Sequence, residues 1–157
     1  MQFTSTQDIN APLDYVFQQL TDFDAYESFA LRRGAQVQRK DNIPSKGIGL
    51  TWNVVGEFRG KVRDVDIQVV EYRPDNILKF MITSKGIDAA ADFEAMALTR
   101  KQSRIKSTLN VTPKTISARL VLQSAKLAKQ SLNRRYNNRF ATFSNYIENN
   151  YNKSQRG

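Results

Sequence analysis

Residues 50–84 decide the fold and read LTWNVVGEFRGKVRDVDIQVVEYRPDNILKFMITS. Apolar and polar residues alternate through most of this stretch, which is the period typical of half-buried β-strands. Turn-forming residues interrupt the alternation at Gly60 and at Pro74-Asp75-Asn76. The stretch therefore predicts strands at residues 50–59, 61–72 and 77–84. Connections this short favour antiparallel pairing between neighbouring strands.

The alternation changes phase within the second of these strands. Val65 and Ile67 occupy odd positions, whereas Val70 and Tyr72 occupy even positions. A change of this kind is typical of a β-bulge, which bends a long strand and increases its twist. We therefore expect the sheet to be strongly curved.

The same alternation continues on both sides of this stretch. It predicts further strands at residues 3–9, 35–40, 88–99 and 103–111, which makes seven in all. Two short helices are expected after the first strand. The first begins near Ala11-Pro12, because proline is tolerated in a first helical turn. The second begins at Asp24, which is followed by Glu27 three residues later in the spacing of a capping box.

A helix of roughly 35 residues is predicted between Pro113 and Asn150, because no glycine or proline interrupts this segment. At about 100° per residue, one set of apolar side chains forms a stripe that should pack against the sheet. This stripe consists of Ala118, Leu122, Ala125, Leu132, Tyr136, Phe140, Phe143 and Ile147. Ile116, Leu120 and Leu127 fall on nearly the opposite face, so we expect a loop of the chain or a second copy in a homodimer to cover them.

Length and composition indicate one soluble domain. The chain has 157 residues, and we assign residues 1–151 to the domain and residues 152–157 to a frayed polar tail. It contains no cysteine and no histidine, which excludes disulfides, thiolate nucleophiles, imidazole bases and Cys or His metal sites. We expect no metal and no cofactor. The amino-terminal residues lack a basic segment followed by an apolar one, so a cytoplasmic location is expected.

Positive charge is concentrated in the carboxy-terminal third. The formal net charge is +9, and Glu148 is the single acidic residue within 99–157. Such asymmetry is compatible with binding to nucleic acid or to an anionic membrane, and also with a merely solvated helix. The cations of the predicted helix fall on several of its faces, which favours the solvated helix. They are Arg119, Lys126, Lys129, Arg134, Arg135 and Arg139.

Four short stretches carry a resemblance to a known superfamily: Ile9-Asn10-Ala11-Pro12, Leu20-Thr21-Asp22, Gly47-Ile48-Gly49 before Thr51-Trp52, and Glu71-Tyr72-Arg73-Pro74. Together with the order of elements, they resemble the SRPBCC or START-like superfamily across essentially the whole chain. The resemblance implies an α+β helix-grip fold, in which a bent antiparallel sheet of seven strands wraps around a long C-terminal helix. Members include pollen-allergen-like ligand carriers and polyketide cyclase-like proteins. No catalytic residue of these proteins can be transferred to this sequence.

In a helix-grip fold a cavity lies between the sheet and the terminal helix. Strand parity and the helix stripe indicate which residues would line it. Small residues surround Phe93 on the strand 88–99, which leaves room either for close helix packing or for a ligand. Lys129 interrupts the stripe and would either meet an anionic group of a ligand or extend into water. The predicted ligand-binding residues are Trp52, Val54, Phe58, Phe80, Ile82, Ala91, Phe93, Ala95, Leu109, Lys129, Leu132 and Tyr136.

Three functions remain open from the sequence. We favour a non-catalytic carrier or sensor that binds a small hydrophobic molecule, either lipid-like or polyketide-like. The first alternative is an enzyme of the cyclase or hydratase type. Without histidine it would need other side chains to move protons. Asp64 and Asp66 could form an acid/base pair, but two carboxylates two residues apart on one strand more commonly mark a solvated strand edge. The second alternative is binding of nucleic acid or an anionic membrane through the basic C-terminal helix.

Overall fold

The computed structural model describes residues 1–156. Seven strands form a single sheet in the order β1-β7-β6-β5-β4-β3-β2, and every neighbouring pair is antiparallel. The strands are β1 (Gln2–Ile9), β2 (Gln36–Arg39), β3 (Thr51–Phe58), β4 (Lys61–Arg73), β5 (Ile77–Ser84), β6 (Ile87–Thr99) and β7 (Gln102–Pro113). The predicted strand set is thus confirmed. The expected bulge lies in β4, where the pairing with β5 shifts between Val69 and Glu71.

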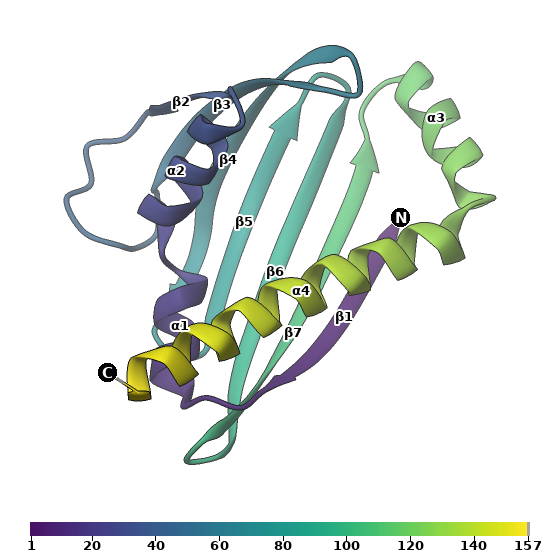
Figure 1. Ribbon diagram of the computed structural model, residues 1–157. Coiled ribbons are helices and arrows are strands. Elements are labelled where there is room, and N and C mark those ends of the chain that lie inside the picture. The colour runs from purple at the N-terminus through teal and green to yellow at the C-terminus, as the bar shows by residue number, and fades with distance from the viewer. Residues whose placement is uncertain (157) are drawn as a thin grey trace.

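The helices lie against one face of this sheet. They are α1 (Leu13–Leu20), α2 (Phe23–Arg32), α3 (Ile116–Lys126) and α4 (Lys129–Arg156). In Figure 1, α4 crosses the sheet diagonally in front of β1, β7 and β6, while α2 lies at the β2 side of the sheet; α1 contacts β6, β7 and α4. The architecture is α+β with the expected helix-grip arrangement, in which a curved antiparallel sheet partly surrounds the terminal helix.

The prediction of one uninterrupted C-terminal helix is wrong. The chain turns sharply between α3 and α4 (Figure 1). At this turn the N–H groups of Leu127 and Ala128 donate to the carbonyl oxygens of Ser124 and Ala125, three residues earlier instead of four. The regular helical ladder therefore ends there without a glycine or proline, because tightened bonds of this kind can close a helix. Helix α4 continues to Arg156, so residues 152–156 of the expected frayed tail are helical, while Gly157 lies outside the described residues.

The hydrophobic core lies where α1 and α4 meet the sheet. Ile9, Leu78, Ile105 and Ile147 are fully buried there. Helix α4 contributes Phe140 and Ile147 to this core, one on each side of the buried Ser144. The part of α4 that carries these residues is therefore fixed to the sheet by apolar contact, which is the main favourable contribution to packing.

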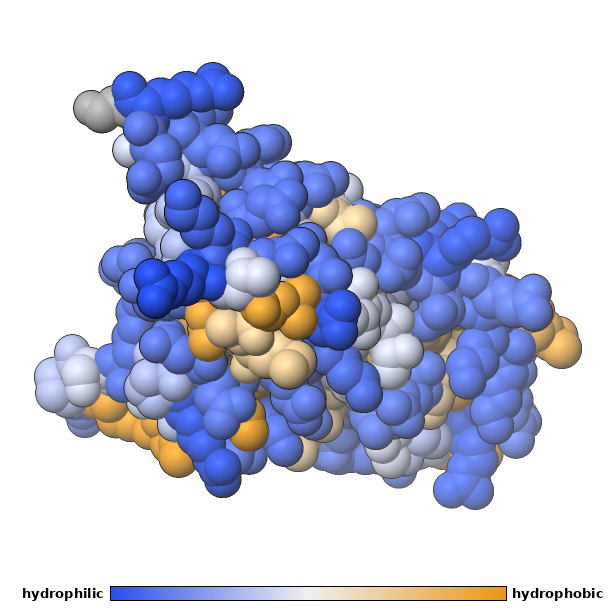
Figure 2. Space-filling view, turned by 90° about the horizontal axis from the view of Figure 1, so that it is seen from below, coloured by the Kyte–Doolittle hydropathy of each residue, from blue (hydrophilic) through white to orange (hydrophobic). Residues whose placement is uncertain are grey.

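The outer surface is mainly hydrophilic. Figure 2 shows the molecule from below, with hydrophobic residues confined to a few separated groups among hydrophilic ones. Within residues 1–156 no helix is both long enough and apolar enough to cross a lipid bilayer.

Candidate ligand-binding cavity

A cavity of about 490 Å³ lies between the sheet and the helices α2 and α4. Its volume falls within the range of about 300–1,000 Å³ that is usual for small-molecule sites. The lining residues come from the end of α1, from α2, from β2 to β6 and from α4. They are Leu20, Phe23, Tyr26, Glu27, Ala30, Val37, Trp52, Val54, Ile67, Leu78, Phe80, Ile82, Ala91, Phe93, Phe140 and Phe143.

Strand register explains why these sheet residues face the same space. Phe80 on β5 lies opposite Ala91 on β6, and Leu78 lies opposite Phe93. Because side chains alternate between the two faces of a strand, residues at every second position point into the cavity. Ala91 is the small member of this set, so the space in front of its Cβ atom stays open where a larger side chain would fill it.

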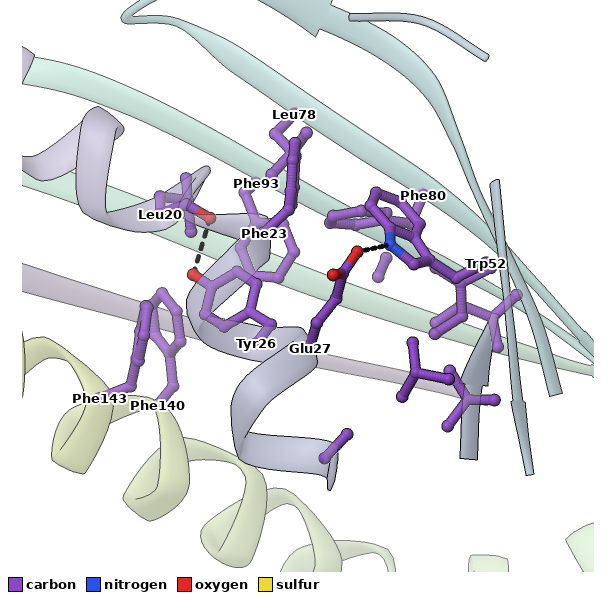
Figure 3. A pocket seen from close by; sticks show the side chains of 16 residues that line it. Leu20, Phe23, Tyr26, Glu27, Trp52, Leu78, Phe80, Phe93, Phe140 and Phe143 are labelled. Atoms are coloured by element: carbon purple, nitrogen blue, oxygen red, sulfur yellow. Dashed lines mark hydrogen bonds between the residues drawn. The ribbon is translucent and has the colours of Figure 1, made fainter. Parts of the chain in front are cut away.

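Aromatic rings form most of the cavity wall. Phe23 on α2 packs against Trp52 and Phe80, and Phe93 on β6 connects Phe80 to Phe140 on α4. The ring centroids of these pairs are 5.2, 6.1, 6.2 and 6.1 Å apart. These separations are typical of favourable tilted and edge-to-face contacts. The wall is therefore a connected arc of rings that runs from α2 across the sheet to α4 (Figure 3).

The two hydrogen-bond donors on the cavity wall are already used. The Tyr26 hydroxyl donates to the carbonyl oxygen of Leu20 at 2.7 Å, and burial raises the pKa of this phenol. The indole N–H of Trp52 donates to Oε1 of Glu27 at 2.6 Å. Figure 3 shows the Glu27 side chain pointing from α2 toward Trp52 and Phe80. Glu27 is the single carboxylate among the lining residues, and its bond to Trp52 leaves it further acceptor capacity.

The outer side of the Trp52 ring is held by a charged pair. The Arg39 guanidinium lies 5.4 Å from the centroid of the Trp52 ring. It also donates two hydrogen bonds to the carboxylate of Asp41, at 2.9 and 2.8 Å. Asp41 accepts in addition from the backbone N–H groups of Ile43 and Thr51. This carboxylate therefore ties the loop after β2 to the start of β3, next to the cavity.

Asp41 gives a testable dependence of stability on pH. Hydrogen bonds from Arg39 and from the backbone N–H of Thr51 hold its pKa well below the usual range. A carboxyl group with a lowered pKa in the folded state stabilises the fold above its unfolded pKa of about 4, and this stabilisation is lost as the pH falls toward the folded value. We expect acidification below about pH 4 to cost the wild type more stability than Asp41→Asn. Urea unfolding of both proteins across this range measures the difference, and parallel pH profiles would contradict it.

Six of the twelve predicted site residues line the cavity: Trp52, Val54, Phe80, Ile82, Ala91 and Phe93. The other three predicted strand residues lie outside the cavity. Phe58 shares the parity of Trp52 but lies exposed near the end of the β3–β4 hairpin. Ala95 is buried in the core opposite Ile105, and Leu109 lies between Ala91 and Phe3 on the neighbouring strands.

The three predicted residues of the first half of α4 also lie outside the cavity. They are Lys129, Leu132 and Tyr136. Lys129 is exposed at the first residue of the helix. The hydroxyl groups of Tyr136 and Ser107 share a hydrogen bond, which places this part of α4 over β7. Because α4 crosses the sheet diagonally, only its later residues Phe140 and Phe143 reach the cavity.

Sequence reasoning missed the contribution of α2. Phe23, Tyr26, Glu27 and Ala30 all line the cavity from this helix. Their spacing of three, four and seven residues places them on one helical face, so the signal was present in the sequence. Leu20, Val37 and Ile67 were also missed, whereas Phe140 and Phe143 belong to the helix stripe that was expected to line the cavity, and Leu78 shares the inward parity of Phe80. The described residues contain no cluster of three or more acidic side chains that could hold a metal ion.

Comparison with known proteins identifies the fold. No protein-family model matches the sequence, and no curated protein matches it either. Solved structures do match. An aromatase/cyclase from Streptomyces superposes with a TM-score of 0.65 at 12% identity, covering 94% of this chain and 93% of that one. Ara h 8.0201 gives a TM-score of 0.62 at 16% identity, with 94% and 97% covered.

Norcoclaurine synthase from Thalictrum flavum gives a TM-score of 0.57 at 12% identity, covering 73% of this chain and 70% of that one. Identities this low establish a shared fold and leave function open, because one fold hosts many activities. The chain therefore has the helix-grip fold that the sequence resemblance implied.

Proposed function

We propose that this protein binds a small apolar molecule in the cavity between the sheet and helices α2 and α4, as a non-catalytic carrier or sensor. One observation carries the proposal. The cavity has a volume of about 490 Å³, and all its lining residues except Tyr26 and Glu27 have apolar or indole side chains. An apolar ligand gains about 0.8 kcal/mol for each methylene group that it buries. The ligand is therefore lipid-like or resembles an aromatic polyketide.

An enzyme of the cyclase type is the second candidate. Glu27 favours it, because a carboxylate beside a cavity can act as a general base. Two of the proteins with a similar fold, from Streptomyces and Thalictrum, are named as enzymes. Against it, Glu27 already accepts a hydrogen bond from Trp52, and the Tyr26 hydroxyl donates a hydrogen bond to the carbonyl oxygen of Leu20. The wall thus lacks a second acidic or basic side chain to complete a proton transfer.

Filling the cavity tests the carrier function. We expect Ala91→Phe to weaken binding of N-phenyl-1-naphthylamine, a neutral apolar fluorescent probe, by at least about tenfold, because the added ring occupies the space in front of Phe80. The measurement is a fluorescence titration of the purified protein.

Ala90→Phe is the matched control. Ala90 is the neighbour of Ala91 on β6, lies opposite Met81 and Asn110, and faces the other side of the sheet. The control should bind the probe as the wild type does. If Ala91→Phe does not fold, Val54→Phe provides a second obstruction of the same cavity. A wild type that does not bind the probe, or a folded Ala91→Phe that binds it equally well, would overturn the proposal.

A further inference from the structure

Helix α3 turns an apolar face toward the solvent. Ile116, Leu120 and Leu127 are 82%, 59% and 93% exposed. Their spacing of four and eleven residues places them along one side of the helix. The opposite side carries Ala118, which is buried where α3 joins the sheet. Large side chains this exposed on one helical face usually mark an interaction site.

The β3–β4 hairpin exposes two further apolar side chains at the same end of the molecule. Phe58 and Val62 flank its turn and are 59% and 74% exposed. They point to opposite faces of the hairpin, because Phe58 pairs with Lys61 and Val62 with Glu57. In Figure 1 this turn, the β5–β6 turn and the first residues of α3 lie together at one end. Gly86 in the β5–β6 turn lies against Thr115, which precedes α3, and accepts a hydrogen bond from the N–H of Lys114. We call Ile116, Leu120 and Leu127 the α3 face.

Cations lie beside the α3 face and on the hairpins at the same end of the molecule. Arg119 and Lys126 lie on α3 itself, and Arg59, Lys61 and Lys85 lie on the two hairpins. None of these five side chains takes part in an ion pair within residues 1–156. The acidic residues at this end are Glu57 and Asp64 near the β3–β4 turn and Asp88 after the β5–β6 turn, which pairs with Lys114. The segment from residue 115 to residue 147 contains no acidic residue. The surroundings are therefore positive on balance.

We propose that the α3 face docks onto the surface of an anionic lipid membrane, with its apolar side chains inserted between the head groups and the neighbouring cations paired with lipid phosphates and carboxylates. An amphipathic helix with cations beside its apolar face is the kind of element that binds in the plane of a bilayer. Anionic lipids add electrostatic attraction for each nearby lysine or arginine. Charge complementarity and exposed apolar area thus point to the same partner.

Two other occupants fit the face less well. A second copy of the chain would bring the cations Arg119 and Lys126 of both copies into one interface without an acidic partner on α3, and the net charge of +9 opposes this association. A nucleic acid would pair with the cations but would leave Leu127 and Ile116 in water. A membrane satisfies both parts of the surface.

The docking surface and the cavity do not share residues, because no residue of the α3 face lines the cavity. Docking can therefore be tested without any ligand. If the protein is a carrier, as proposed above, docking would let it exchange its apolar ligand with the membrane. This consequence rests on the proposed function. Failure of the probe titration would remove this exchange and leave the docking intact.

Co-sedimentation of the purified full chain with lipid vesicles tests the proposal. We compare vesicles of phosphatidylcholine alone with vesicles that contain about 30 mol% phosphatidylserine, at about 0.15 M salt. The double variant Leu120→Ser with Leu127→Ser removes apolar side chains without changing the charge. The double variant Met81→Ser with Met96→Ser is the matched control, since both methionines are exposed on the sheet. Circular dichroism checks that each variant is folded.

The wild type and the methionine variant should bind the anionic vesicles equally and bind the neutral vesicles weakly. The leucine variant should bind the anionic vesicles at least about tenfold more weakly, because the inserted apolar area is lost. Equal binding by the leucine variant would show attraction by charge alone and would overturn the proposal. The proposal would also be overturned if the wild type bound neither kind of vesicle, or if light scattering showed a dimer that the leucine substitutions abolish.

Discussion

Replacing Ile147 with alanine is expected to lower the free energy of unfolding by about 2–5 kcal/mol, the range found when large side chains are truncated in well-packed cores. Ile147 is fully buried, and with Phe140 it carries the contact of α4 with the core. The cavity created by the truncation would lie between the helix and the sheet. Neither can collapse freely onto it, because α4 is tied at both ends of this contact: Asn137 accepts a hydrogen bond from Ser5, and Glu148 from the N–H of Asn10.

Ser144→Ala on the same helix is the matched control. The Ser144 side chain is buried, and its hydroxyl makes no hydrogen bond within residues 1–156. Removing an unpaired buried hydroxyl costs little and can stabilise a protein, because its desolvation is uncompensated. Urea unfolding should therefore show a large loss for Ile147→Ala and none for Ser144→Ala. Equal losses for the two variants would contradict the prediction, because they would mean that the buried Ile147 side chain contributes no more to the attachment of α4 than the Ser144 hydroxyl does.

The strands could be predicted from the sequence because alternation and turn residues are local signals. Gly60 and Pro74-Asp75-Asn76 separate stretches of regular alternation, and the observed boundaries follow them. The break between α3 and α4 could not be predicted in this way. No helix-breaking residue marks it, and the chain leaves the helix at Leu127, a side chain with almost no packing partner.

In the candidate site, too, the residues on the strands could be predicted from the sequence, whereas the α4 residues that reach the cavity could not be singled out. Parity along β3, β5 and β6 identified Trp52, Phe80 and Phe93, because the inward face of a strand follows from the position of each residue. Which α4 residues reach the cavity depends on the angle at which α4 crosses the sheet. A helical wheel shows which residues share a face and gives no information on this angle. Tyr136 and Phe143 belong to one stripe, yet Tyr136 bonds to Ser107 on β7 and only Phe143 reaches the cavity.

Glu27 should make the cavity select against anionic ligands. It is the single carboxylate on the wall, and Arg39, the cation beside Trp52, already pairs with Asp41. A ligand carboxylate held within about 5 Å of Glu27 would be repelled by about 3 kcal/mol at an effective dielectric constant of about 20, which is more than about a hundredfold in affinity. A hydroxyl group at the same place could donate a hydrogen bond to Glu27. A fatty alcohol should therefore bind far more tightly than the fatty acid of equal chain length.

Displacement of the neutral probe by dodecan-1-ol and by dodecanoate at neutral pH measures this preference. In Glu27→Gln the charge is removed, while the amide oxygen can still accept from Trp52, so binding of dodecanoate should recover most of the difference. Glu94→Gln makes the same charge change on an exposed side chain of β6 that does not line the cavity, and it should keep the preference of the wild type. If the wild type binds both compounds equally while the probe still binds, the carrier function stands and the carboxylate has no part in selecting the ligand. A preference that survives Glu27→Gln would assign the selection to the apolar wall, because desolvating an anion among aromatic rings is costly even without a like charge nearby.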